Sequence, residues 1–122
     1  GAMTKVLIVD DTSQVRMLVG RYLQAKGYEI SEAENGEEGV VAAIADRPDL
    51  ILMDLNMPVM DGFKATQEIK SKAMLKDVPI IALTAESDTE SRQAIYAAGC
   101  DAFVSKPIDF KLLMTKIEAQ VI

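Results

Sequence analysis

Hydrophobic runs of strand length alternate along this chain with segments in which apolar residues recur every three or four positions. Short apolar runs are typical of β-strands, and the three-to-four spacing is typical of amphipathic helices. The runs predict strands near 6–9, 28–33, 50–53, 80–83 and 102–105. The spaced segments predict helices near 15–23, 37–46, 62–69, 88–98 and 110–121.

Capping and turn-forming residues lie between these segments. Ser13 can cap the start of the first helix, and Gly27 follows its end. Pro48 ends the second helix, Pro79 opens the fourth strand and Gly99 closes the fourth helix. No linker interrupts the pattern, so the 122 residues fit one domain.

The alternation of strands and helices predicts an α/β protein. The inner strand runs are continuously hydrophobic, as expected when helices cover both faces of a parallel sheet. Right-handed crossovers then give an open, doubly wound sheet of five parallel strands with five helices. Ligands bind such sheets at the carboxyl ends of the strands.

Four of the predicted strands end in side chains that suit phosphate chemistry. Asp10 and Asp11 follow the first strand, Asp54 the third, Thr84 the fourth and Lys106 the fifth. Because the carboxyl ends of parallel strands meet at one edge, we expect three carboxylates, a hydroxyl and an ammonium in one pocket. Such a pocket can bind a divalent cation and hold a phosphoryl group.

Clustered carboxylates require a counter-charge. Two of them about 5 Å apart repel by roughly 3 kcal/mol at an effective dielectric of about 20. Lys106 supplies one positive charge. Mg²⁺ would supply two more, and it favours a site with one or two carboxylates, several waters and a phosphate oxygen.

Asp54 is the best candidate for a nucleophile among the three aspartates. It stands alone at the end of a predicted central strand, before a loop that contains a proline. A carboxylate can attack phosphorus and form an acyl phosphate. Lys106 would pair with an oxygen of that phosphoryl group, and Thr84 could donate its hydroxyl to another.

Composition excludes several other classes. The net charge of −6 argues against direct binding of nucleic acid, and the apolar stretches are too short to span a membrane. The absence of histidine excludes Ser-His-Asp catalysis and histidine metal sites. The single cysteine, Cys100, favours a reducing compartment and thus the cytoplasm. Residues 1–3 are interpreted as a tag remnant with the initiator methionine, and 4–122 as the domain.

The chemistry-bearing motifs resemble those of the receiver domain of two-component response regulators. They follow the family's order and spacing over nearly the whole chain. The matching pieces are Val9-Asp10-Asp11, Leu52-Met53-Asp54, Asn56-Met57-Pro58, Met60-Asp61-Gly62, Leu83-Thr84-Ala85 and Lys106-Pro107. The resemblance implies a flavodoxin-like sheet with strand order 2-1-3-4-5.

The resemblance also implies roles at the site. Asp54 would be the phosphoacceptor, taking its phosphoryl group from a histidine of a sensor kinase or phosphotransfer protein. Mg²⁺ would be held by Asp10, Asp11 and Asp54, with the main-chain carbonyl of Asn56. The chain would then be a signalling switch that assists its own phosphorylation and dephosphorylation, and no enzyme in the ordinary sense.

Further family positions concern switching and the lifetime of the phosphate. Thr84 would move toward the phosphoryl group and the ring of Phe103 would turn inward, where family members often have tyrosine. Asn56 and Glu86 occupy positions that tune the lifetime. The Lys106-Pro107 peptide bond is often cis in the family.

The output of such a switch would be a changed surface on the fourth helix, fifth strand and fifth helix. Ile95, Tyr96 and Leu112 are the candidate exposed apolar residues there. The downstream protein partner is not identified by the sequence. A monomer and a phosphorylation-dependent dimer both remain open.

Simpler explanations apply to several residues taken singly. Phe103 is equally well explained as a core aromatic, and Cys100 as a small buried apolar group. The methionines near the site are expected to pack there without a ligand role: Met53, Met57 and Met60. A solvated acidic face is expected at Glu32, Glu34, Glu37 and Glu38.

Two alternative functions remain beside the switch. The chain could be a receiver excised from a hybrid histidine kinase or a larger regulator. An aspartate-nucleophile phosphatase is a further alternative, but such enzymes commonly use an Asp-x-Asp arrangement after the first strand, where this chain has Asp10 and Asp11 adjacent. A nucleotide or flavin binder is disfavoured because no G-x-G-x-x-G or P-loop pattern is present.

Overall fold

The computed structural model describes residues 3–85 and 89–121, and in them strands and helices alternate strictly. The strands are β1 (Lys5–Val9), β2 (Glu29–Ala33), β3 (Leu50–Asp54), β4 (Ile80–Thr84) and β5 (Ala102–Ser105). The helices are α1 (Ser13–Ala25), α2 (Gly36–Ala45), α3 (Gly62–Lys70), α4 (Thr89–Ala98) and α5 (Phe110–Val121). The strands pair in parallel in the order β2-β1-β3-β4-β5, which confirms the predicted fold class and strand order.

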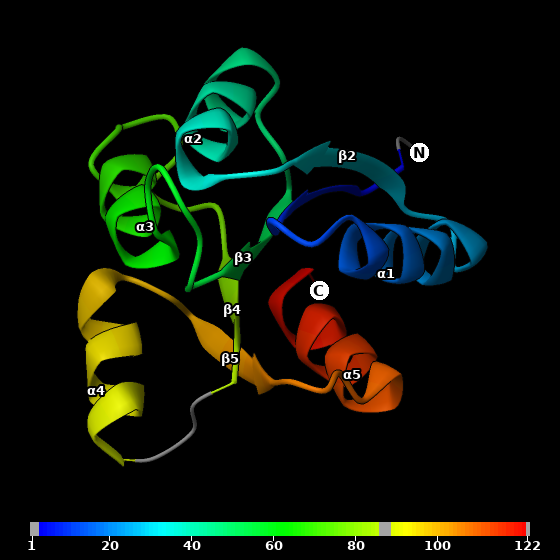
Figure 1. The fold of residues 1–122 in the computed structure, drawn as a ribbon. Helices are drawn as coiled ribbons and strands as arrows, with labels where there is room; N and C mark the ends of the chain where they lie inside the picture. Colours follow the sequence, from blue (N-terminus) through cyan, green and yellow to red (C-terminus); the bar gives the residue numbers. More distant parts are fainter. Residues whose placement is uncertain (1–2, 86–88, 122) are drawn as a thin grey trace.

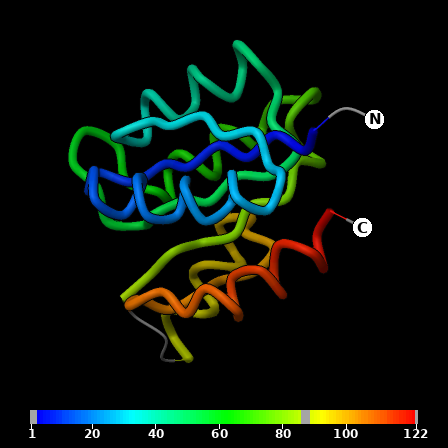
Figure 2. The backbone as a smooth tube through the Cα atoms, turned by 90° about the vertical axis from the view of Figure 1, so that its right-hand side faces the viewer, coloured from blue at the N-terminus to red at the C-terminus, as the bar shows by residue number. Residues whose placement is uncertain are grey.

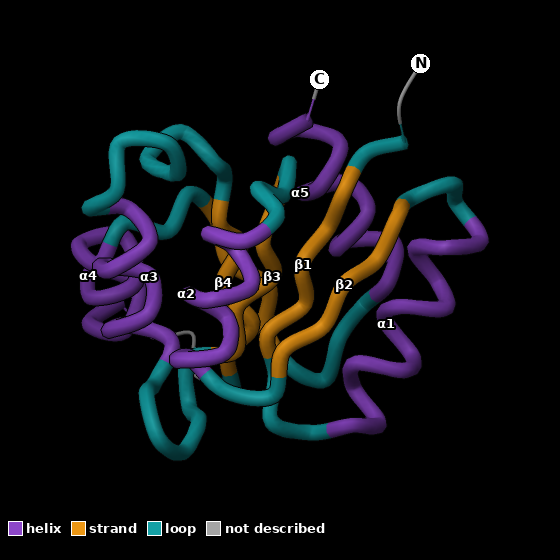
Figure 3. Tube along the Cα trace, turned by 90° about the horizontal axis from the view of Figure 1, so that it is seen from above, coloured by secondary structure: helices purple, strands orange, loops and turns teal. Residues whose placement is uncertain are grey.

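The sheet lies between two layers of helices. Figure 1 shows α1 and α5 on one side of the sheet and α2, α3 and α4 on the other, and Figure 3 shows the same division from above. β3 is buried along all five residues. β1, β3 and β4 form the centre of the sheet, and the uninterrupted hydrophobic runs in the sequence belong to these three strands.

Alternate residues of a strand pack into two separate hydrophobic cores. Leu7 and Met53 belong to the core beneath α2, α3 and α4. Their neighbours Ile8 and Leu52 belong to the core beneath α1 and α5. Successive side chains of a strand point to opposite faces, so a run that is apolar at every position can fill both cores at once.

The two ends of the sheet carry different parts of the chain. Figure 2 shows the blue start of β1 and the red end of α5 at the same end of the molecule. The carboxyl ends of the strands, where the polar residues follow, lie at the other end. Among the described helices, none has the length and apolar character that a membrane crossing requires.

Two local predictions were wrong. Ser13 is the first helical residue of α1, and Thr12 holds the N-cap position without a side-chain cap. Ile95 is fully buried, whereas Tyr96 and Leu112 are exposed as expected. Neighbouring helical residues are about 100° apart around the axis, so Ile95 can face the core while Tyr96 faces outward. The predicted helix start at Asp88 lies outside the described residues.

Candidate functional site

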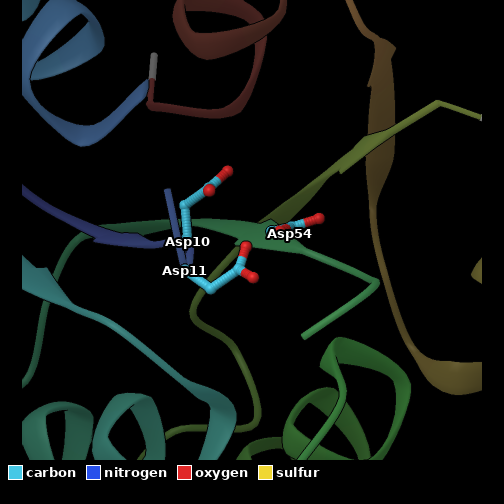
Figure 4. Close-up of side chains that lie close together, drawn as sticks. All are labelled: Asp10, Asp11 and Asp54. Atoms are coloured by element: carbon cyan, nitrogen blue, oxygen red, sulfur yellow. The ribbon is translucent and has the colours of Figure 1, made fainter. Parts of the chain in front are cut away.

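The strand register brings the ends of β1, β3 and β4 side by side. Val9 pairs with Met53, so the residues that follow them, Asp10 and Asp54, lie at about the same level. Asp54 pairs with Leu83, so Thr84 lies one residue further along the neighbouring strand. Carboxylate oxygens of Asp10, Asp11 and Asp54 all lie within 4.8 Å of one another. Figure 4 shows Asp10 and Asp11 extending from the end of β1 beside Asp54. The geometric part of the prediction, that these acids share one site, is therefore confirmed.

Asp10 is the most firmly held of the three acids. It is fully buried, and its Oδ1 accepts a hydrogen bond of 2.8 Å from the backbone N–H of Thr12. Its Oδ2 accepts a bond of 3.0 Å from Nζ of Lys106. Arg16 of α1 donates to the Asp10 carbonyl at 2.6 Å. Hydrogen bonds therefore hold both the side chain and the backbone of Asp10 in place.

Asp54 is almost as deeply buried but is less well neutralised. Its Oδ1 accepts one hydrogen bond of 3.2 Å from the backbone N–H of Asn56 and lies 3.5 Å from Nζ of Lys106. Burial and the negative charge of Asp10 raise the pKa of Asp54 to about 6, against the opposing effect of Lys106. One ammonium therefore does not balance the carboxylates, and the site favours additional positive charge.

Lys106 joins the fifth strand to this site. Burial lowers the pKa of Lys106, but the hydrogen bond and charge of Asp10, together with the charge of Asp54, outweigh that effect and leave the pKa raised. Its backbone N–H donates to the Thr84 carbonyl at 2.7 Å, and the Lys106-Pro107 bond is cis, as the resemblance implied. Thr84 itself is buried at the end of β4.

Two glycines allow the loop after β3 to close against the site. A Cβ on Gly62 would collide with the backbone carbonyl of Asp54, and one on Gly36 would collide with the carbonyl of Met60. Instead, the N–H of Gly62 donates to Leu55 at 3.0 Å. The sequence pattern assigned no role to Gly36 and indicated Gly62 as part of the motif Met60-Asp61-Gly62 at the start of a helix. Each of the two glycines directly follows a residue whose side chain caps the start of a helix. This sequence of a capping residue and then a glycine is the signal that could have identified both positions.

Comparison with known proteins identifies this arrangement. The family model of the response regulator receiver domain matches residues 6–118. The chain belongs to this family of receiver domains.

Individual relatives agree with that assignment. The transcriptional regulatory protein ResD of Bacillus subtilis is 38% identical over 116 residues, which are 95% of this chain and 47% of ResD. This receiver domain thus spans about half the length of the first curated relatives that it matches.

Solved structures give the same result. The chemotaxis response regulator CheY4 of Vibrio cholerae superposes with a TM-score of 0.93 at 35% identity, covering 98% of this chain and 99% of CheY4. The receiver domain of the sensor histidine kinase PA1611 from Pseudomonas aeruginosa gives 0.91 at 32% identity, with 98% of each chain covered. That structure is described as having a magnesium ion coordinated in its active-site cleft.

Two other predicted residues of the receiver domain, Asn56 and Phe103, lie within the described structure. Asn56 is exposed and contacts Asp54 through its backbone N–H. Phe103 is half-buried on β5, and its ring meets that of Tyr96 edge-on at 6.2 Å between centroids. Glu86 lies outside the described residues. Arg16, which the sequence analysis missed, lies six positions after Asp10 without a motif to single it out.

The burial and exposure expected of the other residues are confirmed. Cys100 is buried, and burial raises the pKa of its thiol to about 11. Met53 is fully buried, while Met57 and Met60 pack against the core near the site. The predicted acidic face is exposed at Glu32, Glu34, Glu37 and Glu38.

Proposed function

We propose that this receiver domain is a switch controlled by phosphorylation of Asp54. The observation that supports it is the placement of Asp54: a buried carboxylate at the end of the central strand, within 3.5 Å of Lys106 and beside Asp10 and Asp11. The phosphoryl donor is a histidine of a sensor kinase or phosphotransfer protein. A carboxylate nucleophile needs little further protein chemistry, because phosphoryl transfer depends on positioning and neutralisation of charge.

The step exchanges one bond for another at phosphorus. An oxygen of the Asp54 carboxylate attacks, the new O–P bond forms, and the P–N bond of the phosphohistidine breaks. The electron pair of the broken bond returns to the imidazole, which takes a proton from solvent. Lys106 lies where it can pair with a phosphoryl oxygen, and the buried Thr84 hydroxyl is the proposed donor to another.

The residues present fit a Mg²⁺ ion. Their three carboxylates lie close together, and burial together with the negative charge of Asp10 raises the pKa of Asp54. Asp10, Asp11 and Asp54 would hold the ion with the carbonyl of Asn56. When bound, Mg²⁺ would neutralise the phosphoryl oxygens as charge develops on them.

The proposed output is a shift between two states of the α4–β5–α5 side. Thr84 moves toward the phosphoryl group, and Phe103 turns into the space that Thr84 leaves. The phosphate must contact one state better than the other for this shift to occur. Tyr96 and Leu112 lie exposed on that side for a downstream protein to contact. Side chains at Asn56 and Glu86 would set the lifetime of the phosphate.

Intact-mass spectrometry after treatment with acetyl phosphate tests the proposal. We expect the mass of one phosphoryl group to be added with Mg²⁺ and not with a chelator. Asp54→Asn should abolish the addition, while Asp77→Asn, which changes an exposed aspartate, should leave it unchanged. Labelling of the Asp54→Asn protein at the wild-type level would refute the assignment.

A second assay separates the switch from a phosphatase. The protein is incubated with small phosphoesters and Mg²⁺, and released phosphate is counted per molecule of protein. A switch should release little more than one phosphate per molecule of protein during the lifetime of its phosphorylated form. Sustained multiple turnovers would instead support an aspartate-nucleophile enzyme.

A further inference from the structure

The outer side of α2 carries apolar residues that nothing in the described chain covers. Val40 and Ala43 of α2 are buried in the core. On the adjoining, solvent-facing side of the helix, Val41 is 61% exposed and Ile44 is 55% exposed. Together with Glu37 they form an i, i+4, i+7 stripe, which lies along one line of a helix surface. Exposed aliphatic residues in a row on a helix are typical of an interaction surface.

The two ends of this stripe carry opposite charges. At the start of α2, a hollow is lined by Glu32, Glu37 and Glu38, together with Val41. At the end of α2, a second hollow is lined by Arg47 and Lys72 together with two exposed apolar residues, Ile44 and Met74. The surface therefore changes along α2 from acidic, through apolar, to basic.

Charges at both ends remain available for a partner, although Glu32 at the acidic end is paired with Arg16 at 3.1 Å. Arg47 donates from Nε to the carbonyl of Met74 at 2.8 Å, which orients its guanidinium beside the basic hollow without neutralising it. Within residues 3–85 and 89–121, no ion pair involves Glu37, Arg47 or Lys72. Asp46, the acid next to Arg47, is paired with Lys5 at 2.9 Å.

A two-fold rotation makes this surface complementary to itself. Glu37 lies in the first turn of α2, and Arg47 lies two residues beyond its last residue, so the two charges are near opposite ends of the helix. A two-fold axis that passes between Val41 and Ile44 lays the acidic end of one copy over the basic end of the other. The contact between the acidic end of one copy and the basic end of the other then forms twice, and the apolar residues meet at the centre. This is the requirement of an isologous interface.

We propose that the α2 face, formed by Glu37, Val41, Ile44, Arg47, Lys72 and Met74, is an interface between two copies of this chain packed antiparallel along α2. A second copy fits better than an unrelated acidic or basic partner, because a partner of one sign would match only one end of the face. The interface uses none of the residues of the proposed phosphorylation site. It also lies apart from the α4–β5–α5 side, so it would form in the unphosphorylated protein.

Analytical ultracentrifugation of the unphosphorylated chain over a range of concentrations tests the interface. Because natural interfaces of small area are weak, the concentrations should reach about 1 mM. We expect a reversible monomer–dimer equilibrium. Ile44→Ser should abolish the dimer, whereas Leu112→Ser on α5 should leave it unchanged. Both positions are exposed, so the thermal midpoint should change little in either variant.

Reversal of charge gives the sharper test. Glu37→Lys alone, or Lys72→Glu alone, places like charges together twice in its own homodimer and should weaken association about tenfold or more. An equimolar mixture of the two variants restores both opposite-charge contacts and should recover association to within about threefold of wild type. Neither side chain caps a helix in the described structure, so both variants should fold normally.

Three results would overturn the proposal. The first is a protein that stays monomeric over the whole concentration range. The second is a dimer that Leu112→Ser disrupts and Ile44→Ser does not. The third is a mixture of the charge-reversed variants that associates no better than either variant alone.

Discussion

The ammonium of Lys106 lies 3.0 Å from a carboxylate oxygen of Asp10, although 96 positions separate the two residues in the chain. Asp10 is fully buried, while a quarter of the Lys106 side chain remains exposed. The contact ties the end of β5 to the end of β1 across the two strands between them. This one lysine thus supplies the positive charge beside a carboxylate that, in the described part of the chain, is otherwise held only by the backbone N–H of Thr12.

Lys106→Ala should destabilise the protein by about 2–4 kcal/mol, because it leaves a buried charge unpaired. Urea unfolding followed by circular dichroism measures this loss, and Lys111→Ala, at an exposed position of α5, is the matched control. Asp54 should still accept a phosphoryl group in the Lys106→Ala protein, but the signal should no longer reach Tyr96. A variant as stable as the control would show that Asp10 does not depend on Lys106.

The contribution of Asp54 to the stability of the metal-free protein should fall as the pH rises from about 4 to 6. Asp54 has a pKa raised from 3.8 to about 6, so in this range the folded state binds its proton more tightly than the unfolded state does. The loss of stability is complete above the pKa of Asp54 in the folded state and amounts to at most about 3 kcal/mol.

The Asp54→Asn protein isolates this contribution. It should lack this part of the pH dependence and should be more stable than wild type at pH 7 in the presence of a chelator. Added Mg²⁺ should raise the thermal midpoint of the wild type more than that of the variant. Stability curves of the two proteins that run parallel between pH 4 and 7 would contradict the raised pKa.

Gly62→Ala should destabilise the protein by at least about 2 kcal/mol, because the new Cβ collides with backbone atoms that cannot move aside easily. Gly20→Ala is the matched comparison, since its Cβ would lie 3.6 Å from a methyl group of Ile30 in ordinary contact. In the interior of α1 this change should be neutral or stabilising by up to about 1 kcal/mol. Equal unfolding free energies for the two variants would rule out the close approach at Gly62.

Cys100 should react with a thiol reagent such as DTNB only when the protein unfolds. Its side chain is 5% exposed, and burial raises the pKa of the thiol to about 11. The reactive thiolate is therefore both scarce and covered in the folded state. The rate of labelling should rise with urea in parallel with the unfolding transition. Rapid labelling without denaturant would contradict this burial.

Much of the fold could be predicted because hydrophobic pattern determines which segments form the sheet. The run Leu50–Met53, short and apolar at every position, is typical of a strand covered on both faces, and it proved to be the central one. The end of that run marked Asp54, and the ends of the others marked Asp10 and Lys106. Parallel topology then brought these residues together without any further information.

The predictions that failed depend on details finer than the pattern. Ser13 and Thr12 are both suitable capping residues, and only backbone geometry decides which of them takes the N-cap position. Ile95 and Tyr96 are both apolar neighbours in α4, and the sequence alone does not show which one faces the core. The contact of Arg16 with the Asp10 carbonyl depends on a side-chain conformation that no motif specifies.

The division of each strand between two cores makes the protein far more sensitive to changes in length than to changes in composition. Removing one residue from β3 would transfer every later side chain of that strand to the opposite layer. The acid at the end of the strand would then point away from its partners, even though the acid itself is retained. Insertions and deletions in the strands should therefore abolish signalling at positions where conservative replacements are tolerated.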